Sequence, residues 1–141
     1  HPRSKHYIKQ RNIQFHPLVK EMKPFCFTDY NFLQIHAKCV ISDSGTLPEE
    51  SAFFHSKGYP FAAVCIRTST ERPEAMEKGN FILGGIGQES VKQAVQVAIR
   101  MIENQEMTSI VPDYIEENVS IKVVKIIQSY VSVVNKVVWR K

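Results

Sequence analysis

The sequence lacks several features that would place it in a familiar class. No apolar run approaches the roughly 20 residues of a membrane span, and no signal peptide is visible. The five histidines and three cysteines lack the spacing of a metal site, and no G-x-S-x-G motif of a serine hydrolase is present. We therefore expect reduced, buried thiols in a cytoplasmic protein, with no metal and no membrane contact. Because the first residue is His1 and not Met, we expect that the N-terminus has been cut or processed.

Acidic residues are scarce in two stretches of the chain. The chain of 141 residues has a net charge of +4, with 43% hydrophobic and 23% charged residues, as in a globular domain. Six Lys/Arg and one acid lie between Arg3 and Lys23, and five Lys/Arg and no acid follow Ser120. Such basic patches could attract nucleic acid, a phosphorylated ligand or another domain, and charge alone leaves these open.

Short apolar runs alternate with helical patterns. Strands are expected at Cys39–Ile41, Phe61–Ile66 and Phe81–Leu83, and the continuous run of the second is typical of a strand buried on both faces. A further strand is possible at Lys20–Phe25. Helices are expected from Pro2 to Gln10, from an N-cap at Thr28 to His36, from Thr46 to about Gly58, from Pro73 to Gly79, from Gln88 to Asn104 and from Asn118 to Val138. This order predicts an α/β fold, a Rossmann-like parallel sheet with helices on both faces.

The tail differs from the rest of the chain. We expect a truncated Rossmann-like domain over residues 1–111 and a C-terminal segment over residues 112–141. The helix in this segment has more apolar positions than one sheet face usually buries. We therefore expect it to pack partly on a missing domain or on a second chain.

The stretch from Ser42 to Glu50 is the best candidate site. Turn residues follow a strand and open a helix, which directs backbone N–H groups and a helix dipole toward an anion. Thr46 and Glu49 have the T-x-x-E spacing of a capping box. Glu50 has no such role and could accept hydrogen bonds from two vicinal ribose hydroxyls. An ordinary capped helix with a solvated acidic first turn is the alternative.

Further residues are expected near this turn. The loop Arg67–Glu74 leaves the next strand and supplies two arginines that suit a diphosphate. Phe27 and Tyr30 are core residues by default, but one of them could stack on a base. Gly84–Gly87 follows a strand but does not complete a dinucleotide motif, so we interpret it as a plain turn.

Two motifs together carry a resemblance. The run S-D-S-G from Ser42, followed by Glu49-Glu50, and T-E-R-P-E-A from Thr70 resemble the non-hydrolysing UDP-N-acetylglucosamine 2-epimerases. The match runs from about Lys23 to Ile102. The tail from Pro112 is similar to the branch that makes UDP-N-acetyl-L-fucosamine for surface polysaccharides such as capsule and O-antigen, acting on UDP-2-acetamido-2,6-dideoxy-L-talose.

The resemblance implies the C-terminal half of a two-domain fold like that of B-type glycosyltransferases, with a UDP-sugar in the cleft. It implies that the UDP-binding residues are Tyr30 beside the uracil, Ser44, Gly45 and Thr46 at the diphosphate, Glu50 on the ribose and Arg72 near the phosphates.

The implied reaction is elimination of UDP to a 2-acetamidoglycal and its return to the other face, with no cofactor. The catalytic acid, base and histidine of the family belong to segments not present here, so the catalytic residues are unknown and we expect the fragment alone to be inactive. The implied partners are an N-terminal domain and, for the full-length enzyme, a second copy in a homodimer, with no nucleic acid.

The sequence departs from the family in two places. Thr46 replaces the second glycine of D-S-G-G, and the stretch from Glu50 to Arg72 is roughly five residues longer than the common type. Two other functions stay open: a B-type glycosyltransferase, against which E-R-P-E argues, and a non-catalytic nucleotide-binding module.

Overall fold

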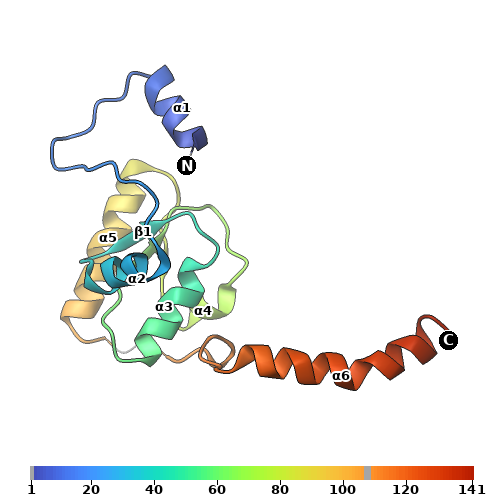
Figure 1. The fold of residues 1–141 in the computed structure, drawn as a ribbon. Coiled ribbons are helices and arrows are strands. Elements are labelled where there is room, and N and C mark those ends of the chain that lie inside the picture. The colour runs from blue at the N-terminus through green and yellow to red at the C-terminus, as the bar shows by residue number, and fades with distance from the viewer. Residues whose placement is uncertain (1, 107–108) are drawn as a thin grey trace. The chain divides into compact units, whose positions relative to one another are not determined.

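The computed structural model describes residues 2–106 and 109–141 and divides the chain into two compact units, His1–Asn31 and Phe32–Lys141. Helix α2 begins in the first unit and ends in the second. In order, the elements are α1 (Pro2–Gln10), α2 (Phe27–His36), β1 (Val40–Ser42), α3 (Leu47–Ser56), β2 (Ala63–Cys65), α4 (Pro73–Glu77), β3 (Ile82–Leu83), α5 (Gln88–Glu103), the short 3-10 helix η1 (Pro112–Tyr114) and α6 (Val119–Val137) (Figure 1).

The first unit holds α1 and an exposed connection without regular structure. The strand considered for Lys20–Phe25 is wrong: these residues are exposed and pair with no other strand. Its charged residues and Pro24, which has no N–H to donate, do not suit a sheet. The N-cap expected at Thr28 is also wrong, because α2 begins at Phe27. The expected burial of Cys26 is wrong as well, since this thiol is exposed.

The second unit contains the predicted parallel sheet, in the order β1-β2-β3. Val40 pairs with Ala63 in register, and Val64 pairs with Ile82. All three strands are parallel, so their carboxyl ends share one edge of the sheet. β2 lies between the other two strands, and all three of its residues are buried.

Alternate residues of the central strand serve two separate cores. Ala63 and Cys65 pack in one cluster with residues of α3, among them Leu47. Val64 packs in the other cluster with Ala94 of α5. Helices therefore cover both faces of the sheet, which is why the central strand reads as an unbroken apolar run.

The glycine-rich turn after β3 is explained by packing. A Cβ on Gly84 would lie 2.9 Å from Val64 Cγ1 and 3.2 Å from Ala94 Cβ, so a side chain here would push α5 away from β2. Gly85 has a φ of +69°, which favours glycine. These two constraints account for the turn as a connection between a strand and a helix.

The first residues of the tail pack against the rest of the second unit. Val111 is buried in the same core as α3, and the Tyr114 hydroxyl bonds to Glu74. Lys57 Nζ lies 2.6 Å from Glu117 Oε1. Every residue of α6 is exposed, including its many valines and isoleucines. None of the helices in the described part of the chain is long and apolar enough to cross a membrane.

Candidate functional site

Side-chain hydroxyls shape the turn between β1 and α3. Ser42 Oγ accepts from the Ser44 N–H at 3.0 Å, and Ser44 Oγ accepts from the Thr46 N–H at 3.3 Å. The Leu47 N–H bonds to the Ser44 carbonyl at 3.4 Å. The last two bonds are long, so these N–H groups could exchange them for a stronger anionic acceptor.

The predicted capping box does not form. Thr46 precedes α3 with φ −87° and ψ −15°, which is already helical, and its side chain caps no backbone N–H. A capping hydroxyl needs an extended backbone at this position. Instead, Thr46 Oγ1 donates to Glu50 Oε1 at 2.9 Å. Glu50, and not Glu49, thus bonds to Thr46, and it does so through the hydroxyl and not through the backbone N–H.

The Glu50 carboxylate is held at both oxygens. Thr46 donates to Oε1, and the Nε2 of Gln34, on α2, donates to Oε2 at 2.6 Å. A carboxylate has about four lone-pair sites, so roughly two stay available on a side chain of fixed orientation. This arrangement suits a vicinal diol.

Arg72 is paired with the other carboxylate of the first turn. Its Nε lies 2.7 Å from Glu49 Oε1, and its Nη1 donates to the Glu71 carbonyl at 3.1 Å. The hydrogen bond that Arg72 donates to the Glu49 carboxylate raises the pKa of Arg72. The guanidinium thus keeps its charge, and part of its donor fork is not used by these bonds.

Arg67 is the second arginine of this edge. It binds Glu71 with two parallel hydrogen bonds, of 2.9 and 3.0 Å. A Cβ on Gly45 would lie 3.7 Å from Arg67 Nη1, so this guanidinium borders the turn directly. Both residues lie in an irregular loop, where i, i+4 spacing does not predict a pair, so the sequence held no signal for this contact of Arg67. The nearness of Arg67 to Gly45 follows only from the parallel pairing of β1 and β2, which places the ends of the two strands side by side.

The sheet edge therefore gathers most of the predicted UDP-binding residues: Ser44, Gly45, Thr46, Glu50 and Arg72. Tyr30 lies in the first unit, so its role beside the uracil stays a prediction. Each of the two arginines at this edge is paired with a glutamate, and Glu50 adds a further negative charge, so the edge is not a bare basic pocket.

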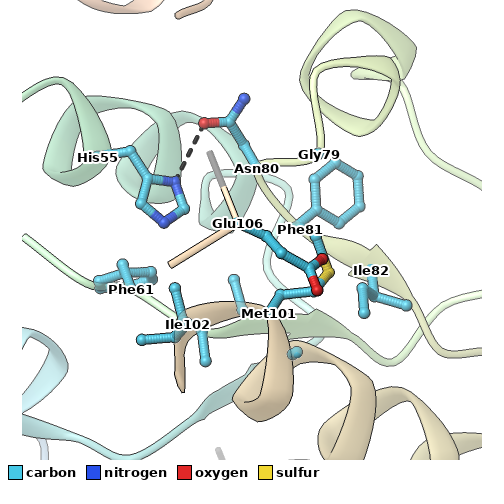
Figure 2. A pocket seen from close by; sticks show the side chains of 12 residues that line it. His55, Phe61, Gly79, Asn80, Phe81, Ile82, Met101, Ile102 and Glu106 are labelled. Atoms are coloured by element: carbon cyan, nitrogen blue, oxygen red, sulfur yellow. Dashed lines mark hydrogen bonds between the residues drawn. The ribbon is translucent and has the colours of Figure 1, made fainter. Parts of the chain in front are cut away.

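A separate cavity lies at the opposite edge, where β2 and β3 begin (Figure 2). It has room for about one water molecule. His55 Nδ1 lies 3.2 Å from Asn80 Oδ1, Asn80 Nδ2 donates to the Ser109 carbonyl at 3.1 Å, and Ser51 donates to the Asn80 carbonyl. Burial lowers the pKa of His55. This partly buried network joins α3 to the segments after α4 and α5, and the cavity is too small for a ligand.

Comparison with known proteins identifies the family. The family described as UDP-N-acetylglucosamine 2-epimerase matches residues 1–128. The chain belongs to this family. The resemblance carried by the D-S-G and T-E-R-P-E motifs is thereby confirmed at the level of the family.

Individual relatives agree with this assignment. The UDP-N-acetylglucosamine 2-epimerase of Methanocaldococcus jannaschii is 28% identical over 108 residues, which is 74% of this chain and 28% of that protein. The protein of the same name from Methanococcus maripaludis is 26% identical over 104 residues, or 71% of this chain and 27% of its own length.

A solved structure extends the likeness to the fold. The structure of UDP-N-acetylglucosamine 2-epimerase from Rickettsia bellii matches with a TM-score of 0.86 and 36% identity, over 100% of this chain and 38% of that one. The predicted α/β class, of the kind found in B-type glycosyltransferases, is confirmed. The chain spans well under half the length of these relatives.

Proposed function

We propose that this chain is the C-terminal, UDP-binding part of a UDP-sugar 2-epimerase of the UDP-N-acetylglucosamine type. The observation that carries the proposal is the sheet edge, where Glu50 is held for a diol beside a turn that two arginines border. This combination suits a nucleoside diphosphate better than a free phosphate, because the ribose and the diphosphate each find a complementary group.

In this proposal the residues hold the leaving group of the reaction. The diphosphate takes the backbone N–H groups of Gly45 to Leu47 and guanidinium donors of Arg72, while the lone pairs of Glu50 accept from the ribose. The positive groups stabilise the charge that UDP carries after elimination. UDP is thereby retained at the turn until it returns to the other face of the sugar.

The finer identity of the substrate is part of the proposal. The tail from Pro112 supports the branch that inverts C2 of a 2-acetamido-2,6-dideoxy-talose nucleotide in surface polysaccharide synthesis. Thr46, which replaces a glycine, reduces the space beside the diphosphate and gives that position a hydroxyl. Incubating the complete protein with UDP-N-acetylglucosamine and with the talose nucleotide, and following C2 inversion by NMR, tests this choice.

The catalytic groups are proposed to lie in another part of the complete protein. We expect a homodimeric cytoplasmic enzyme whose N-terminal domain supplies the acid and the base, so that the 141 residues alone catalyse no inversion. C2 inversion by the purified 141-residue chain would refute this expectation. If the complete protein instead transferred a sugar to an acceptor, it would be a glycosyltransferase.

A further inference from the structure

Gln34 stands out among the buried residues of the second unit. Only 4% of it is exposed, and its Nε2 donates to Glu50 Oε2 at 2.6 Å. Its Oε1 is buried and has no hydrogen-bond partner in the described part of the chain. The amide therefore bonds to Glu50 through its nitrogen, while its buried oxygen stays unmet.

The direction of this amide follows from the chemistry of its partner. Exchanging Oε1 and Nε2 would place a carbonyl oxygen against a carboxylate oxygen, and both atoms are acceptors. The donor must therefore face Glu50, which leaves the unpaired Oε1 as a cost to folding. A methionine would fill nearly the same volume without that cost. Packing alone thus gives no reason for glutamine here.

We propose that Gln34 is a positioning residue for the nucleotide, which acts by fixing the Glu50 carboxylate for the ribose. This inference rests on the proposed function, because it takes Glu50 as the ribose acceptor. Thr46 restrains one oxygen of Glu50 and Gln34 the other, so the plane of the carboxylate is set by two donors. The remaining lone pairs then have fixed directions before the ligand arrives, which lowers the entropy lost on binding.

The first test is Gln34→Met in the complete protein, titrated calorimetrically with UDP, 2′-deoxy-UDP and pyrophosphate. We expect affinity for UDP to fall about tenfold, because a hydrogen bond to a charged group is lost. Affinity for pyrophosphate should stay within about twofold. With 2′-deoxy-UDP the substitution should matter less than with UDP, because one of the hydroxyls that Glu50 serves is absent. Gln96→Leu, on the exposed side of α5, is the control for loss of an amide.

The second test is Gln34→Glu, which places a second carboxylate against Glu50. Near pH 8 the two charges should repel and UDP affinity should fall more than in Gln34→Met. Near pH 5 one shared proton can restore an O–H donor to Glu50, so UDP affinity should recover relative to the wild type at the same pH. A residue that served only packing would show no such recovery.

The outcomes separate the two proposals. If Glu50→Gln leaves the ratio of UDP to pyrophosphate affinity unchanged, the proposed ribose site itself is wrong. If Glu50→Gln lowers that ratio while both Gln34 variants fold and keep it, the positioning role is overturned. Equal weakening of UDP and pyrophosphate by Gln34→Met also overturns it, since the effect would then be a general distortion of the turn.

Discussion

The two edges of the same small sheet hold polar groups in opposite ways. At the carboxyl edge, charged side chains pair where water reaches them, as Arg72 and Glu49 do with 37% and 38% of their side chains exposed. At the amino edge, the half-buried His55 bonds to the buried side chain of Asn80, and the buried Ser51 donates to the Asn80 carbonyl. Exposed ion pairs contribute little to folding, whereas breaking a buried network leaves unpaired groups.

The comparison assigns a different role to each edge. The pairs at the carboxyl edge can exchange partners with a ligand at small cost, which is what a binding site needs. The network at the amino edge cannot exchange partners in this way, and it joins α3 to the segment after α4. Substitutions at one edge should therefore change binding, and substitutions at the other should change the free energy of unfolding.

The largest effect is expected for Asn80→Ala at the amino edge. It removes the partners of His55 Nδ1 and of the Ser109 carbonyl, so the free energy of unfolding should fall by about 2–4 kcal/mol. Chemical denaturation of the complete protein measures it. Asn104→Ala, which loses an exposed bond to Glu106, should change it by less than about 0.5 kcal/mol. If both variants lost a similar free energy of unfolding, the predicted difference between the buried amide of Asn80 and the exposed amide of Asn104 would be wrong.

The next effect is expected for Glu50→Gln at the carboxyl edge. The substitution keeps the shape but replaces a charged acceptor, so UDP binding should weaken by roughly 1.5–3 kcal/mol while pyrophosphate binding is unchanged. Calorimetric titration with both ligands measures it. Glu74→Gln is the matched control, because it makes the same change at a carboxylate that bonds to Tyr114 and not to the turn. If UDP and pyrophosphate weaken equally, Glu50 does not serve the ribose, and the turn is an ordinary helix start.

A smaller effect is expected for the arginine pair. Arg72→Ala should weaken both UDP and pyrophosphate, by about five- to tenfold, because both ligands carry the diphosphate. Glu49→Gln removes the negative charge beside Arg72 and should strengthen pyrophosphate binding slightly. Arg67→Ala should matter less than Arg72→Ala, since both Arg67 Nη groups are already committed to Glu71. The reverse order would make Arg67, which borders Gly45, the main diphosphate ligand.

The smallest effect is expected from the pH dependence of His55. Burial lowers its pKa in the folded state below the ordinary value of about 6.5. As pH falls below about 6.5, the unfolded chain takes up a proton before the folded one does, so folding stability declines and then levels off below the folded pKa. His55→Gln should remove this part of the decline, and His16→Gln, on an exposed residue, should not. Identical pH profiles for His55→Gln and wild type would contradict it.

Much of the fold could be predicted because short stretches of sequence show the residue patterns of its strands and helices. The continuous apolar run around Val64 predicted a strand covered on both faces, and parallel pairing then placed the loop after Ile66 beside the D-S-G turn. The capping box failed because the Thr46 backbone is already helical and because Glu49 pairs with Arg72, which is distant in sequence. No sequence pattern indicated that Gln34 is buried, because α2 mixes polar and apolar residues and has no regular apolar face from which one polar residue would stand out.

The exposure of α6 has a consequence for how this helix forms. It consists largely of valine and isoleucine, which lose side-chain freedom in a helix, and its nineteen residues are close to the length at which isolated helices are marginal in water. With no residue buried, it draws little support from the rest of the chain. A surface that covers α6 would therefore shift a helix–coil equilibrium as well as make contacts. Slow amide hydrogen exchange along α6 in the complete protein would report such a surface before its residues were known.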